Sequence, residues 1–169
     1  MFEAPPMPTS WDAFHPLIVH FPVALLLVVP LLIILGIIFK NKANCFYISG
    51  FILLLLGTIS TFIAVSTGIE AGEVVSILRT PEFNEAITEH MELATTTRTV
   101  FTILTVLYAV ILFFPKIVKR NFKQASIPIA QIAFLIVYTY GLLLVSNTAH
   151  EGGRLVHEFG VKGNIVREN

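Results

Sequence analysis

Four histidines carry the chemistry that this sequence suggests: His15 and His20 within HPLIVHFP, His90, and His150. Imidazole nitrogens bind zinc, copper and iron, and they are common axial ligands of haem iron. His15 and His20 are five residues apart, which places them about 140° apart around an ideal α-helix. They therefore do not share a face, as the two histidines of a helical zinc motif do. Each is expected to reach a partner on a neighbouring helix.

The elements that must position these residues are membrane spans. The chain has 169 residues, of which 55% are hydrophobic and 13% charged, and its mean hydropathy is +0.80. Soluble domains carry about a quarter charged residues, so a bilayer must bury this apolar excess. A span needs about 20 apolar residues and must be helical. Four runs qualify: 17–39, 46–69, 94–114 and 127–147. The links at 40–45 and 115–126 are short and the one at 70–93 is longer, which predicts an all-α, up-down four-helix bundle in a single domain over 1–169.

Basic residues predict the orientation of the bundle. The link at 40–45 carries two lysines, and the link at 115–126 carries three lysines and an arginine. Links rich in Lys and Arg stay in the cytoplasm, so both termini and the loop at 70–93 are expected outside, on the periplasmic side. The tail at 148–169 is too polar and glycine-rich to span, and is expected to fold over the outer face. A net charge of zero argues against a nucleic-acid partner.

Proline and threonine mark two expected helix boundaries. Pro16 suits the first position of a helix, where its missing N–H costs nothing. Pro22 cannot donate to the carbonyl of Ile18, so the first helix should loosen there. Thr80-Pro81-Glu82 has a capping hydroxyl, a proline and an early acid, which is a helix start signal. The third helix is therefore expected to project outward by several turns and to carry His90.

This topology brings all four histidines to the outer end of the bundle, on three different helices. A flat macrocycle between helices would use such an arrangement, with one axial imidazole from each side. Gly68 and Gly72 would let a macrocycle approach the backbone. Arg98 lies about one turn inside the outer boundary of its span, where an unpaired arginine is expensive. A haem propionate would be a bidentate partner for it; the alternative partners are Glu70, Glu73 and Glu92.

A structural role is the alternative for each of these residues. His15 and His20 would then be interfacial imidazoles bonded to carbonyls that the prolines leave free. His90 would be a solvated helix residue, and His150 would cap the fourth helix. The glycines would serve close helix packing alone.

Three segments also carry a resemblance: HPLIVHFP, TGIEAG after the second span, and TAHEGGRLVHEFGV after the fourth. They resemble the motifs of a family of small bacterial four-helix membrane proteins, catalogued only as a domain of unknown function. Its members stand beside, or are fused to, c-type cytochrome or Rieske domains, which implies electron transfer. Variation among them implies one site with His20 and His150 and another with His15 and His90. Their tail usually reads LVY where this chain has LVH, so His157 is discounted as a ligand.

The resulting hypothesis is a membrane subunit of the bacterial inner membrane that binds haem b. One haem would use two of the four histidines, and two haems would use all four. Its electrons would pass to or from a quinol or a periplasmic partner such as a c-type cytochrome, which makes it an electron carrier more than a stand-alone enzyme. The absence of CxxCH excludes covalent c-type attachment. The alternatives are a zinc or copper site on the same histidines, helped by Glu70 or Glu73, and a cofactor-free structural subunit.

Overall fold

A computed structural model of the chain describes residues 11–75, 80–117 and 126–161. All regular elements in these ranges are helices, and four of them are long and apolar enough to cross a membrane. In chain order the elements are η1 (Asp12–Phe14), α1 (His15–Ile18), α2 (His20–Ile38), η2 (Lys40–Lys42), α3 (Ala43–Val75), α4 (Pro81–Ile117) and α5 (Ser126–His157). The prediction of an all-α membrane protein is confirmed.

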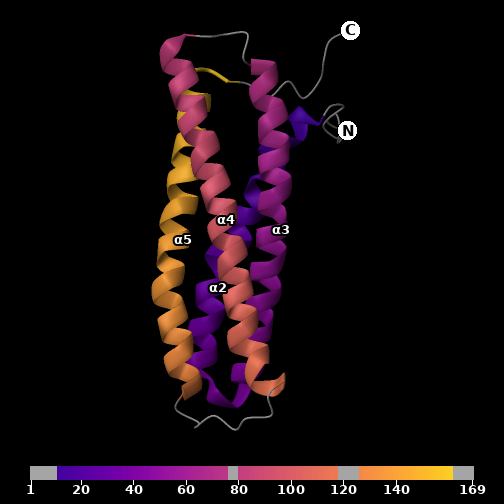
Figure 1. Cartoon of the computed structure of the whole chain (residues 1–169), viewed down its shortest axis with the longest axis vertical. Helices are drawn as coiled ribbons and strands as arrows, with labels where there is room; N and C mark the ends of the chain where they lie inside the picture. The colour runs from indigo at the N-terminus through magenta and orange to yellow at the C-terminus, as the bar shows by residue number, and fades with distance from the viewer. Residues whose placement is uncertain (1–10, 76–79, 118–125, 162–169) are drawn as a thin grey trace, which may run out of the picture.

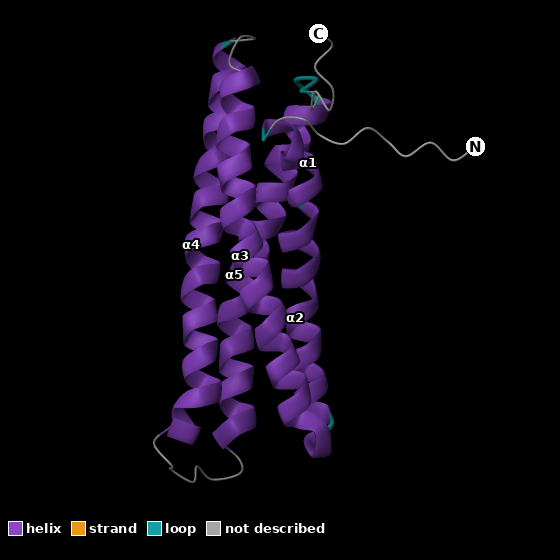
Figure 2. Ribbon diagram, turned by 90° about the vertical axis from the view of Figure 1, so that its right-hand side faces the viewer, coloured by secondary structure: helices purple, strands orange, loops and turns teal. Residues whose placement is uncertain are grey.

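The long helices form one up-down bundle (Figures 1 and 2). Helix α2 packs along α3, α4 packs along α5, and contacts between α3 and α4 and between α2 and α5 close the ring. The start of α2, the end of α3, the start of α4 and the end of α5 therefore meet at one end, which we call the histidine end. The α2–α3 turn lies at the opposite end, which we call the lysine end.

Two predicted boundaries are confirmed. Helix α1 stops at Ile18, and α2 begins at His20, so the break at Val19 falls where Pro22 cannot supply an N–H. Helix α4 begins at Pro81, and the Phe83 N–H donates to the Thr80 hydroxyl over 3.2 Å. This capping bond satisfies one of the donors that a helix start leaves free.

Aromatic residues fill the centre of the bundle, while its outside remains apolar. Tyr108 and Phe134 stack with ring centroids 4.5 Å apart, and the Tyr138 hydroxyl donates to the Leu26 carbonyl over 2.8 Å. Outward-facing side chains such as Ile136 are 70% exposed. Large apolar surface on the outside of long helices suits contact with lipid.

The sequence places the end of the last span at residue 147, and in the structure helix α5 continues for ten residues beyond it, to His157. Arg154 stabilises the added turns by pairing with Glu151 (2.6 Å) and Glu158 (3.3 Å), at i−3 and i+4. The helix ends only before Gly160, whose φ of 68° is in the left-handed region. A segment this polar is unfavourable inside the bilayer core, but it can still be helical where the helix projects beyond the bilayer. Residues 162–169 lie outside the described ranges, and so do Lys119, Arg120 and Lys123 of the link predicted at 115–126.

Candidate functional site: two imidazoles at the histidine end

His15 is held against α3 by two polar contacts and one close packing contact. Its Nδ1 lies 3.0 Å from the Ala64 carbonyl oxygen and 3.1 Å from the Thr67 hydroxyl. Its ring lies over Gly68, where an added Cβ would stand only 2.9 Å from Cε1. The absence of a side chain at Gly68 is thus what lets the half-buried imidazole approach the helix.

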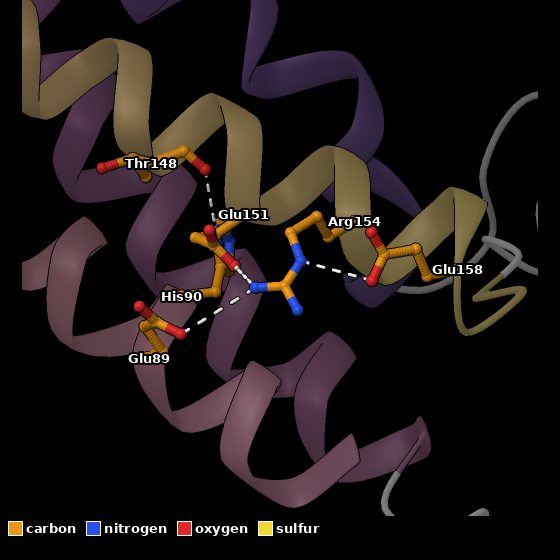
Figure 3. A network of polar contacts seen from close by, with 6 residues as sticks. All are labelled: Glu89, His90, Thr148, Glu151, Arg154 and Glu158. Atoms are coloured by element: carbon orange, nitrogen blue, oxygen red, sulfur yellow. Dashed lines mark hydrogen bonds and ion pairs between the residues drawn. The ribbon is translucent and has the colours of Figure 1, made fainter. Parts of the chain in front are cut away.

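His90 is held against α5 in the same manner (Figure 3). Its Nδ1 lies 3.2 Å from the Thr148 carbonyl oxygen. Its ring lies over Gly152, where an added Cβ would stand 3.1 Å from Cε1. The bundle thus has two halves, α1–α2–α3 with His15 and α4–α5 with His90. In each half the accepting carbonyl belongs to the residue four before the glycine. Each imidazole therefore occupies an equivalent notch, the space that the glycine leaves open on the partner helix.

The equivalence extends deeper into the bundle. The Leu26 side chain packs over Gly57, where an added Cβ would stand 2.7 Å from Leu26 Cδ2. The Phe101 ring packs over Gly141, where an added Cβ would stand 3.0 Å from Phe101 Cζ. Leu26 and Phe101 each follow the histidine of their half by eleven residues, and Gly57 and Gly141 each precede the glycine of their half by eleven. Eleven residues make about three helical turns, so each side chain returns to nearly the same face of its helix. The α1–α2–α3 and α4–α5 units therefore repeat one packing scheme.

Among the described residues, no hydrogen bond engages Nε2 of either imidazole. A carbonyl oxygen only accepts, so Nδ1 of each ring must carry the proton and donate. In a neutral imidazole the other nitrogen, Nε2, then keeps its lone pair, which is the arrangement that metal-ligating histidines use. The two imidazoles are also close enough to interact electrostatically. The histidine end thus presents two oriented imidazoles, one from each helix pair.

A charged network surrounds the His90 half (Figure 3). The Glu151 side chain is only 11% exposed, pairs with Arg154, and interacts electrostatically with His90. Glu89 lies 4.0 Å from the same guanidinium. The corresponding position of the other half, one before the glycine, is Thr67. This network was not predicted from the sequence, although the spacing of Glu151, Arg154 and Glu158 on one helix face indicates it.

The remaining histidines have different surroundings. His20 is exposed, and its Nδ1 lies 2.7 Å from the Pro16 carbonyl oxygen of the preceding helix α1. His150 and His157 are exposed on α5. Within the described ranges, no three His, Cys, Asp or Glu side chains gather closely enough to hold a metal ion.

The other predicted site residues lie along the α3–α4 seam. Arg98 is half-buried, and its guanidinium carbon lies 5.3 Å from the centroid of the Phe62 ring, a cation–π contact. Gly72 faces Ile87, whose Cδ1 would stand 3.4 Å from an added Cβ. Gly68 therefore belongs to the imidazole site, whereas Gly72 serves the contact between α3 and α4.

Comparisons with known proteins agree with the architecture. Residues 12–164 match a family described as "Predicted membrane protein (DUF2231)", a domain of unknown function. No curated protein and no solved structure matches the chain.

Proposed function

We propose that this chain, which belongs to the DUF2231 family of predicted membrane proteins, is a b-type haem-binding subunit for electron transfer. The observation that supports the proposal best is the equivalence of His15 and His90. Each imidazole stands in a glycine notch, donates from Nδ1 to a carbonyl, and keeps Nε2 free. His15 and His90 would hold a haem, whose iron accepts imidazole nitrogens as ligands.

The residues of the chain would orient and tune the bound group. Haem supplies one-electron chemistry at its iron. The Ala64 and Thr148 carbonyls fix the rotation of the two rings and increase the basicity of their free nitrogens. Gly68 and Gly152 set the depth of each ring. Loss of such supporting contacts typically weakens metal binding by about 10–100-fold.

Arg98 suits a propionate group. Among the described residues its guanidinium contacts an aromatic ring, and none of the salt bridges includes it. A half-buried arginine whose charge is not balanced by a carboxylate would gain a charge-assisted hydrogen bond from an anionic ligand group.

The number of haems depends on His20 and His150. His15 and His90 would hold one haem, and the two exposed histidines would serve a second. If two haems bind, replacing either exposed histidine by Ala should halve the haem content. If one haem binds, the content should stay unchanged.

We further propose that the histidine end faces the periplasm of a bacterium, with the N-terminus on that side of the inner membrane. The support is the density of Lys and Arg in the two links at the lysine end. Among the described residues the acidic side chains belong to the other end, since the sequence has none between Asp12 and Glu70 or between Glu92 and Glu151. That acidic surface would attract a positively charged redox partner such as a c-type cytochrome, while a quinol could donate from the membrane.

The test is an absorption spectrum of protein purified from haem-replete cells, with a pyridine haemochrome assay. We expect a Soret band and a sharp reduced-minus-oxidised α band. His15→Ala and His90→Ala should each lose haem, and His157→Ala, which also removes a histidine near this end, should retain it. A folded protein that is colourless would refute the proposal, and metal analysis of the same sample would then decide for or against zinc or copper.

A further inference from the structure

A cavity opens at the lysine end, where α2 turns into α3. Its volume is about 570 Å³. The lining residues are Ile38, Phe39, Lys40, Asn41, Lys42 and Phe46. Cations and apolar side chains therefore share one concave surface at the end of two spanning helices.

Among the described residues, no acidic side chain belongs to the lysine end of the bundle, where this cavity lies. The sequence has no Asp or Glu between Asp12 and Glu70, nor between Glu92 and Glu151. In sequence, residues 118–125 between α4 and α5 include two lysines and one arginine and no acidic residue. Lys40 and Lys42 are exposed, and no described salt bridge includes either of them.

The apolar part of the lining is exposed as well. Ile38 is 62% exposed and Phe39 is 54% exposed, and the rings of Phe39 and Phe46 lie against each other with centroids 6.1 Å apart. These side chains follow directly from the lipid-facing surface of α2. A molecule that fits both parts must therefore combine an anionic group with hydrocarbon.

We infer that this cavity binds an anionic glycerophospholipid, with its phosphate at Lys40 and Lys42 and its upper acyl chain against Ile38 and Phe39. Basic clusters at the ends of membrane helices recognise anionic headgroups in this way. Asn41 can donate a hydrogen bond to the headgroup. The inference is independent of haem, because it concerns the opposite end of the bundle.

The expected effect of the lysines follows from the usual strength of such contacts. One Lys or Arg near an anionic membrane surface typically changes binding by about 5-fold, so two together change it by about 30-fold. Lys40→Gln/Lys42→Gln should therefore weaken binding of the lipid by about 30-fold. Lys40→Arg/Lys42→Arg keeps the charge and should retain most of the affinity.

Native mass spectrometry of the full-length protein in detergent tests the inference. The probes are phosphatidylglycerol, phosphatidylcholine and inorganic phosphate, each titrated separately and then in competition. We expect phosphatidylglycerol to bind preferentially, the Gln double variant to lose this preference, and the Arg double variant to keep it. Lys162→Gln/Arg167→Gln, which removes two basic residues beyond the other end of the described chain, should behave as the unmodified protein.

Three results would overturn the inference. Equal binding of phosphatidylcholine, or unchanged phosphatidylglycerol binding by the Gln double variant, would show that Lys40 and Lys42 do not select an anionic lipid. Displacement of phosphatidylglycerol by inorganic phosphate at comparable concentration would assign the site to a free anion instead. Circular dichroism of each variant controls for loss of the fold.

Discussion

Gly68→Ala tests the notch beneath His15 more directly than any histidine variant, because it leaves both imidazoles in the chain. The new Cβ would stand 2.9 Å from Cε1 of His15, whereas ordinary contacts begin at 3.4 Å. The ring must therefore retreat by about half an ångström, against the hydrogen bond to the Ala64 carbonyl at 3.0 Å. Gly153 is the matched control, because an added Cβ there meets nothing within 4 Å.

The free energy of unfolding is expected to fall in Gly68→Ala and to rise in Gly153→Ala. Alanine gains about 1 kcal/mol over glycine inside a helix. Overpacking typically costs about 1–3 kcal/mol, and a strained hydrogen bond about 1 kcal/mol more. Gly68→Ala should therefore lose about 1–3 kcal/mol, while Gly153→Ala should gain about 1 kcal/mol. The difference corresponds to roughly 10 °C in thermal midpoint for a chain of this size.

The assay is thermal unfolding of both variants in the same detergent, followed by circular dichroism, together with their haem content. Gly68→Ala should unfold at a lower temperature and retain less haem than Gly153→Ala. Gly152→Ala, with its 3.1 Å contact to the ring of His90, should lie between them. If Gly68→Ala is as stable and as haem-replete as Gly153→Ala, the glycine notch does not position His15 and the reasoning is wrong.

Three further predictions concern the rest of the bundle. Gln131→Leu should raise the thermal midpoint, because the fully buried amide has no hydrogen-bond partner among the described residues; a fall would reveal a bound water or ligand that satisfies it. Tyr138→Phe should cost about 1 kcal/mol in urea or thermal unfolding, because it removes the 2.8 Å bond to the Leu26 carbonyl; an unchanged midpoint would contradict this. Arg154→Ala should speed amide hydrogen exchange after residue 150, because Glu151 loses its partner, with protection at Tyr138 unchanged; equal exchange in both proteins would show that the ion pairs do not stabilise the last turns of α5.

The parts of the fold that local chemistry decides could be predicted from the sequence. Hydropathy and the need to satisfy backbone groups in a bilayer identified four helices. The missing N–H of Pro22 located the break at Val19, and the Thr80 hydroxyl located the start of α4. Alternation of direction along short links then placed the histidines at one end of the bundle. Each of these inferences needs only neighbouring residues and the length of a span.

Which residues meet across the bundle depends on how each helix is rotated about its axis, and only the tertiary structure decided that. The two notches have dissimilar sequences. The notch that holds His15 reads AVSTG at 64–68, and the notch that holds His90 reads TAHEG at 148–152, so the sequence shows no internal repeat. Both end in the glycine that admits a ring. The helical end of α5 also depended on tertiary contacts, because Gly152 and Gly153 weaken a helix locally. Packing of Gly152 against His90, together with the ion pairs of Arg154, offsets that weakness.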